Sequence, residues 1–141
     1  MDIVIDFDGT CVTHEFPEVG KDIGATPILK QLVVKGHRLI LFTMRSNNGN
    51  LPLIKGDGIV ETSGNFLDDA VNWFKDRGID LFGIQTNPTQ NTWTTSPKAY
   101  GQLIIDDAAL GCPLIFDTDY AERPFVDWDA VGEYLKGRGI L

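Results

Sequence analysis

The sequence lacks any apolar run long enough to cross a membrane. Its apolar segments, such as Leu39–Phe42 and Leu103–Ile105, are far shorter than the about 20 residues that a bilayer requires. The chain opens on Met1-Asp2-Ile3, an acidic start rather than a basic leader. We therefore expect a protein that is neither inserted in a membrane nor targeted across one.

Cysteine and basic residues are both scarce. Cys11 and Cys112 are the two cysteines of the chain, too few for a disulfide framework, so we expect free thiols and a cytoplasmic protein. Lys and Arg total 12 against 20 Asp and Glu, which leaves a net charge of -8. Such a charge repels phosphate backbones and anionic lipids, so nucleic acid and membranes are disfavoured as partners.

What the sequence does contain is the composition of one globular domain. Of its 141 residues, 43% are apolar or aromatic and 23% are charged, as in ordinary soluble domains. A chain of this length buries about two-thirds of its unfolded surface, enough for a core without structural metals or disulfides. With no internal repeat and no linker, we expect a single domain over residues 1–141.

Short apolar runs alternate with amphipathic stretches along the chain. The runs predict strands at Ile3–Ile5, Arg38–Phe42, Leu81–Ile84, Leu103–Ile105 and Leu114–Phe116, and the amphipathic stretches predict helices at Ala25–Lys35, Asn65–Arg77 and Asp129–Lys136. Residues 51–64 are rich in glycine and predict an irregular or hairpin connection. The alternation predicts an α/β protein with a three-layer α/β/α, Rossmann-like fold and a mainly parallel central sheet.

Acidic residues follow two of the predicted strands. Asp6 and Asp8 come directly after the first strand, and Asp106 and Asp107 follow the fourth. Ligands of parallel sheets bind beyond the carboxyl ends of the strands, where these residues and Thr43 meet. Four carboxylates repel one another unless a cation neutralises them, and oxygen ligands beside a phosphate suit Mg²⁺. The sequence therefore predicts a site for Mg²⁺ and phosphate.

These residues stand in the order of a known set of motifs. Asp6-Phe7-Asp8-Gly9-Thr10, Thr43, Lys98 and Asp106-Asp107 resemble the haloacid dehalogenase (HAD) superfamily over most of the chain. The resemblance implies a HAD-like fold and a Mg²⁺-dependent phosphomonoesterase that acts through an aspartyl-phosphate intermediate. The gaps Cys11–Gly24 and Gln85–Pro97 are too short for a folded cap, so it implies a capless member.

The resemblance also implies a role for each matched residue. Asp6 would be the nucleophile that attacks phosphorus, and Asp8 the general acid and base. Thr43 would bond a phosphate oxygen, and Lys98 would offset the charge of the nucleophile and of the phosphate. The second acid, Asp8, favours a phosphatase over a dehalogenase.

The metal ligands implied by the resemblance are Asp6, the backbone carbonyl of Asp8, and Asp107. Asp106 would bind through water or position Lys98, and the sequence leaves open which of the two adjacent acids touches the metal.

Because no cap is expected, other parts of the protein must determine which substrate binds. Met44 and Arg45 adjoin Thr43, and Arg45 is interpreted either as a ligand for a second anionic group or as part of a surface ion pair. The loop Asn87–Thr95, which contains Trp93, or a neighbouring subunit of a homo-oligomer would supply the missing wall of the site.

Four other functions are weighed against a phosphatase for a small phosphorylated metabolite. The resemblance admits a polynucleotide 3′-phosphatase, because capless relatives include such enzymes, or a nucleotidase-type activity, but the net charge of -8 disfavours a polymer substrate. A receiver domain would need an acid at the end of the third strand, where the sequence reads Ile84-Gln85-Thr86-Asn87. A non-catalytic metal-binding relative stays open, and phosphate release separates it from an enzyme.

Overall fold

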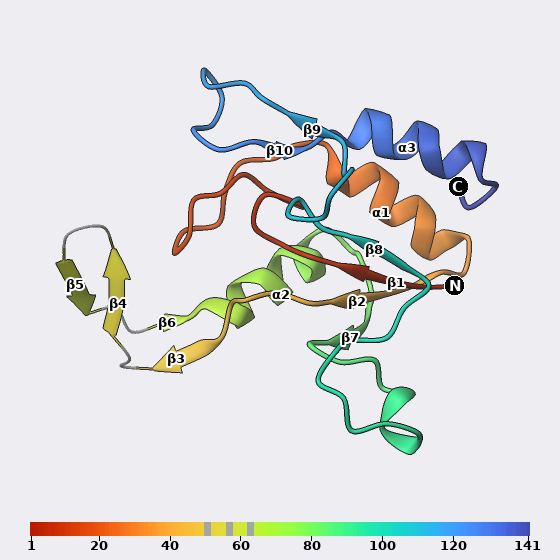
Figure 1. The fold of residues 1–141 in the computed structure, drawn as a ribbon, viewed down its shortest axis with the longest axis horizontal. Helices are drawn as coiled ribbons and strands as arrows, with labels where there is room; N and C mark the ends of the chain where they lie inside the picture. The colour runs from red at the N-terminus through yellow and green to blue at the C-terminus, as the bar shows by residue number, and fades with distance from the viewer. Residues whose placement is uncertain (50–51, 56–57, 62–63) are drawn as a thin grey trace.

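A computed structural model describes residues 1–49, 52–55, 58–61 and 64–141 (Figure 1). The main elements are β1 (Asp2–Ile5), α1 (Ala25–Val34), β2 (Arg38–Leu41), α2 (Phe66–Asp76), β7 (Leu81–Ile84), β8 (Leu103–Ile105) and α3 (Trp128–Gly137). The smaller ones are β3 (Asn47–Gly49), β4 (Pro52–Lys55), β5 (Gly58–Glu61), β6 (Gly64–Asn65), the 3-10 helix η1 (Gln90–Thr92), β9 (Leu114–Ile115) and β10 (Phe125–Val126). The α/β class expected from the sequence is confirmed.

The central sheet has four strands in the order β7-β2-β1-β8. All three pairings are parallel, and Ile3 of β1 lies opposite Leu39 of β2 and Leu103 of β8. The predicted fifth strand does not join this sheet: β9 pairs with β10 in a separate antiparallel ladder. With two residues, β9 is too short to extend a parallel sheet and follows a turn rather than a crossover helix.

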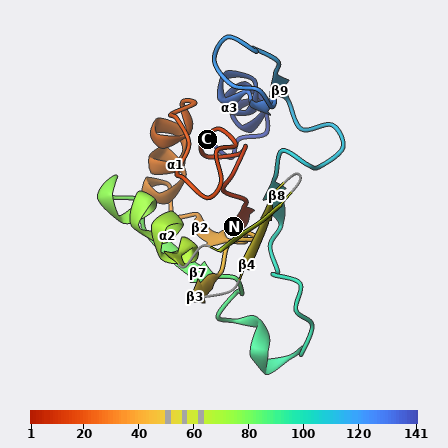
Figure 2. The same cartoon turned by 90° about the vertical axis from the view of Figure 1, so that its left-hand side faces the viewer.

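Helices α1, α2 and α3 pack against one face of the sheet. The core on that face holds Ile3, Ile5, Leu39 and Ile105 of the strands together with residues of α1, α2 and α3. The opposite face carries Val4 and Ile40 and is covered by the segment between β7 and β8 (Figure 2). The sequence prediction of helical layers on both faces is therefore wrong.

The physical reason lies in the connection from β7 back to β8. Because this connection returns across the sheet, a right-handed crossover places it on the face opposite α1 and α2. Residues 85–102 have no amphipathic stripe and contain two prolines, Pro88 and Pro97, so they form only η1. Gly101 lets the segment lie close to the sheet, since a Cβ there would stand 2.8 Å from Val4 Cγ2.

The connection between β2 and α2 contains a hairpin, one of the two forms expected for residues 51–64. β4 and β5 pair antiparallel, as do β3 and β6. Positions 50–51, 56–57 and 62–63 lie outside the described residues.

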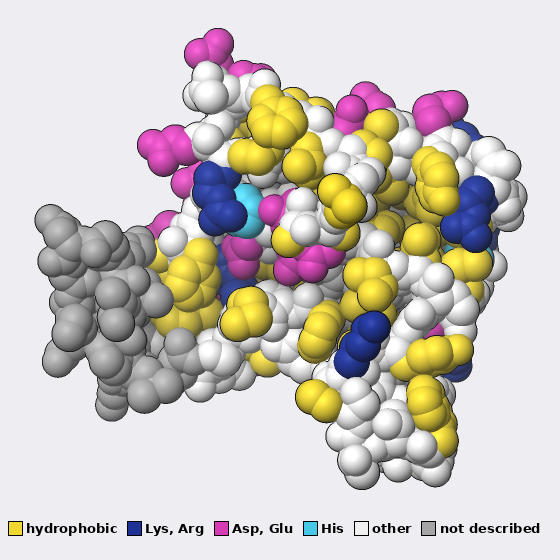
Figure 3. Space-filling view, viewed as in Figure 1, with side chains coloured by type: hydrophobic (Ala, Val, Ile, Leu, Met, Phe, Trp, Pro, Cys, Tyr) yellow, Lys and Arg dark blue, Asp and Glu magenta, His cyan; other side chains and the backbone are white. Residues whose placement is uncertain are grey.

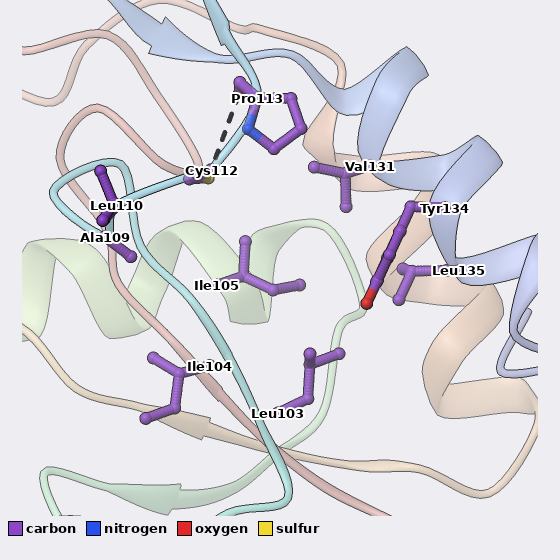
Figure 4. A pocket seen from close by; sticks show the side chains of 11 residues that line it. Leu103, Ile104, Ile105, Ala109, Leu110, Cys112, Pro113, Val131, Tyr134 and Leu135 are labelled. Atoms are coloured by element: carbon purple, nitrogen blue, oxygen red, sulfur yellow. Dashed lines mark hydrogen bonds between the residues drawn. The ribbon is translucent and has the colours of Figure 1, made fainter.

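Strand β8 forms one edge of the sheet. Beside it, a cavity of about 330 Å³ lies between β8, the loop 109–113 and α3 (Figure 4). Its lining is hydrophobic apart from the hydroxyl of Tyr134 and the thiol of Cys112.

Cys11 and Cys112 are both free, as expected. No helix in the described part of the chain is long and apolar enough to span a membrane.

Candidate functional site

Three aspartates meet where β1 and β8 end. One carboxylate oxygen each of Asp6, Asp106 and Asp107 lies within 4.8 Å of the other two, an arrangement that could hold a metal ion. They meet because β1 and β8 are parallel neighbours, with Ile5 opposite Ile105. Three of the four aspartates expected at the carboxyl ends of the strands are therefore brought together, and Asp8 is not one of them.

Hydrogen bonds join this cluster to the loop after β1. The Thr10 hydroxyl lies 2.8 Å from Asp6 Oδ2 and 3.2 Å from Asp107 Oδ1, and it accepts the backbone N–H of Asp107 at 3.0 Å. His14 Nε2 lies 2.7 Å from Asp107 Oδ2. The loop passes close to both groups at Gly9, where a Cβ would stand 2.0 Å from His14 Nε2 and φ is 80°. Glycine is required there by both space and backbone conformation.

The pKa values of Asp6 and Asp107 are shifted in opposite directions. Burial, with the charge of Asp106 adding to it, raises the pKa of Asp6 to about 8. Burial also acts on Asp107, but the hydrogen bonds from His14, Asp6 and Thr10 hold its pKa below the usual value. A cation bound between these carboxyl groups would favour their ionised forms.

Asp8 lies apart from this cluster and pairs with Arg45. Arg45 Nε lies 2.8 Å from Asp8 Oδ2, and Nη2 lies 2.8 Å from Asp8 Oδ1. The remaining N–H groups donate to the carbonyls of Pro17, Glu18 and Phe66. All five donors of the guanidinium therefore have acceptors within the protein.

Arg45 is consequently neither a surface ion pair nor a free anion ligand, which corrects both interpretations made from the sequence. The residue is 2% exposed, and its guanidinium lies 5.1 Å from the ring centres of Phe7 and Phe16. Phe7 and Phe16 both lie in the connection 6–24 after β1, far from Arg45 in the sequence, and they come to flank its guanidinium only in the fold. Met44, expected to line the site beside it, does so and is 97% exposed.

Thr43 is held in place by a residue that sequence reasoning passed over. The side chain of Gln85 accepts the backbone N–H of Thr43 at 2.9 Å and donates to the carbonyls of Thr43 at 2.7 Å and Arg45 at 3.1 Å. Gln85 has a φ of 64°, rare for a residue other than glycine. Its position directly after β7 was the available signal, because residues after parallel strands share one edge.

One cavity of about 410 Å³ unites these groups. It is lined by Asp6, Asp8, His14, Phe16, Thr43, Met44, Arg45, Asp106, Asp107, Ala108 and Arg123. Figure 3 shows acidic side chains gathered beside a histidine and a basic side chain on this face. His14 and Arg123 thus belong to the site, although no motif in the sequence marks either of them.

Lys98 does not reach this cavity. It is exposed and lines a separate cavity of about 250 Å³ with Trp93, Tyr100 and Ile104. Lys98 precedes β8, and the amino end of that strand lies beside Asp2 of β1. Lys98 is therefore at the amino ends of the strands, whereas Asp6 is at their carboxyl ends. The structure therefore gives no basis for the role that the resemblance assigned to Lys98.

The loop Asn87–Thr95 also lies at the amino ends of the strands. Asn87 Nδ2 donates to Asp2 Oδ2 at 2.9 Å, and the Trp93 ring packs edge-on against Tyr100 with 5.3 Å between ring centres. The expectation that this loop walls the acidic site is wrong, because the loop is anchored at the amino ends of the strands.

Comparisons with known proteins place the fold. No family model and no curated protein matches the chain. The chain is similar to a conserved protein from Bacteroides thetaiotaomicron whose structure is solved: the two are 29% identical, with a TM-score of 0.68. The similarity covers 98% of this chain and 91% of that protein. The parallel α/β fold is therefore shared over nearly the whole chain.

Proposed function

We propose that this protein is a capless phosphatase of the HAD superfamily that hydrolyses small phosphate monoesters with Mg²⁺. The observation that carries the proposal is the cluster of Asp6, Asp106 and Asp107 at the carboxyl edge of a parallel sheet. Thr43 of the neighbouring strand end and Asp8 line the same cavity. The order of these residues along the chain agrees with the motifs of that superfamily.

The donor set fits a hard cation. Carboxylate oxygens without sulfur ligands suit Mg²⁺, which binds one or two carboxylates together with substrate phosphate. Asp6, Asp107 and Asp106 would hold it, and the bound ion would offset negative charge on the carboxylates and on the phosphate. We expect activity to vanish in excess chelator and Ca²⁺ to substitute poorly, because the larger ion takes more oxygen ligands.

The residues of the chain divide the chemistry among them. A carboxylate oxygen of Asp6 attacks phosphorus, so that an aspartyl-phosphate forms as the alcohol leaves, and water then releases phosphate. Thr43 Oγ1 accepts the backbone N–H of Arg45 at 3.1 Å, which leaves the hydroxyl hydrogen for a phosphate oxygen. Each oxygen of Asp8 keeps a second lone pair beyond its bond to Arg45, on which a proton for the leaving group can sit.

Phosphate release from a substrate panel tests this proposal. The panel comprises sugar phosphates, nucleotides and 3′-phosphorylated oligonucleotides, each with Mg²⁺ and with chelator. Asp6→Asn should abolish release, because an amide oxygen cannot form the acyl phosphate, while the nearly isosteric side chain keeps the fold. Asp129→Asn, on the exposed side of α3, is the matched control and should leave rates unchanged.

The outcomes separate the candidate functions. Release at the wild-type rate in Asp6→Asn would contradict the assignment of Asp6 as the nucleophile. A preference for 3′-phosphorylated oligonucleotides, sensitive to salt, would move the assignment to a polynucleotide 3′-phosphatase. Mg²⁺ binding without release from any substrate would contradict enzymatic function and indicate a metal-binding relative.

A further inference from the structure

The acidic cavity has a deficit of positive charge. It is lined by Asp6, Asp8, Asp106 and Asp107, and a phosphate dianion that enters it adds further negative charge. Transfer of a phosphoryl group ordinarily needs a cationic side chain beside the metal, to stabilise charge on the equatorial oxygens. Lys98, the residue expected to serve this purpose, lies at the other edge of the sheet.

Two arginines line the cavity within the described part of the chain, and only one has donors to spare. Arg45 already gives all five N–H groups to Asp8 and to three backbone carbonyls. Arg123 is exposed and forms no hydrogen bond or ion pair with the described residues. Its guanidinium is therefore available to an anion.

The backbone around Arg123 is fixed relative to the loop that follows Asp6. The N–H of Val126 donates to the carbonyl of Gly9 at 2.9 Å, which ties β10 to the turn that follows Asp6. The rings of Tyr120 and Phe125 pack edge-on with 5.6 Å between their centres, and Ala121 is buried. Packing on both sides of Arg123 thus holds this stretch of chain at the cavity while the side chain stays free.

We propose that Arg123 binds the phosphate group of the substrate, supplying the cation that Lys98 does not. The inference rests on the proposed phosphatase function and adds the residue that recognises the transferred group. A guanidinium can donate two parallel hydrogen bonds to phosphate oxygens, which a lysine cannot. Arg123 then approaches the phosphate from the β9–β10 connection, whereas Lys98 would have approached it from the segment before β8.

Binding of inorganic phosphate tests the assignment independently of turnover. Calorimetric titration of phosphate into the Mg²⁺-saturated protein should give an affinity about tenfold weaker for Arg123→Gln than for the wild type, the loss of one charged hydrogen-bonding group. Arg123→Lys should fall between them. Arg138→Gln, which removes an exposed arginine at the end of α3, is the matched control and should bind like the wild type.

The results distinguish this inference from the proposed function. Equal phosphate affinity in Arg123→Gln and the wild type overturns the inference, and so does a wild type that binds Mg²⁺ but no phosphate. Phosphate binding that depends on Arg123, in a protein that releases no phosphate from any ester, supports the inference and contradicts only the phosphatase. Circular dichroism and Mg²⁺ titration of each variant confirm that the fold and the metal site are intact.

Discussion

Arg45 clamps Asp8 in a bidentate ion pair inside the protein, with both N–O distances at 2.8 Å. The same guanidinium bonds the carbonyls of Pro17 and Glu18 in the loop after β1 and of Phe66 at the start of α2. It therefore joins the loop that carries Asp8 to the connection that follows Thr43. Two strand ends of the site are held together by one buried side chain.

Replacement of Arg45 should destabilise the fold strongly. Arg45→Met would leave the Asp8 carboxylate and three carbonyls without their donor, and removal of one partner of a buried ion pair costs about 3–5 kcal/mol. Urea denaturation measures this loss as a lower midpoint. Lys136→Met is the control, since its pair with Glu133 at 3.6 Å is exposed and should contribute almost nothing. Equal midpoints for the two variants would contradict the structural role of Arg45.

Asp8→Asn should separate acid catalysis from nucleophilic attack. Asp6 can still attack, but the leaving alcohol is no longer protonated, so an alkyl phosphate should lose far more rate than an aryl phosphate with a good leaving group. Single-turnover phosphoryl transfer measures both. Distortion caused by the unpaired Arg45 would slow the two substrates equally, so equal factors would show that Asp8 is not the general acid.

Gln85→Ala should impair the site without removing a group that touches substrate. The backbone of Thr43 and Arg45 would lose three hydrogen bonds, and small misplacements of site residues cost up to about 100-fold in rate. We expect kcat/KM to fall at least about tenfold on this ground, while Mg²⁺ affinity stays unchanged because the three aspartates lie on other strand ends. Gln31→Ala, on the exposed side of α1, is the control. Unchanged kinetics in Gln85→Ala would refute the positioning role.

The stability contributed by Asp2 should depend on pH. Hydrogen bonds from Arg38, at 2.7 and 3.1 Å, and from Asn87 lower the pKa of Asp2 despite its burial. A carboxyl whose pKa is lowered by folding stabilises the protein above its unfolded pKa of about 3.9 and loses that effect as the pH falls through the folded value.

Asp2→Asn should therefore cost about 1 kcal/mol at pH 7, a modest value because Arg38 is half exposed. Urea unfolding of both proteins at a series of pH values measures the difference, which should shrink toward zero below about pH 4. A constant penalty for Asp2→Asn at every pH would show that hydrogen-bond geometry alone, not charge, accounts for it.

The course of the chain could be predicted well because it depends on local patterns. Continuous apolar runs correspond to β1, β2, β7 and β8, and amphipathic stretches correspond to the three helices, with bounds shifted by a few residues. The convergence of Asp6 with Asp106 and Asp107 also followed from the sequence, because parallel strands bring their carboxyl ends to one edge whatever their order.

Which charged side chains reach that edge was decided by the tertiary structure. Lys98 and Arg45 stand at suitable places in the sequence. Lys98, however, lies before β8 at the amino ends of the strands, and the guanidinium of Arg45 is paired with Asp8. Gln85 and Arg123 enter the site without any motif to mark them.

The sequence by itself determined the strands, the helices and the acidic edge, because backbone hydrogen bonding and burial act over a few neighbouring residues. Only the tertiary structure decided that all three helices cover one face and that Arg123 has a free guanidinium at the acidic cavity. Those features depend on how a connection crosses the sheet and on which donors find acceptors from distant loops, and neither is written in local periodicity.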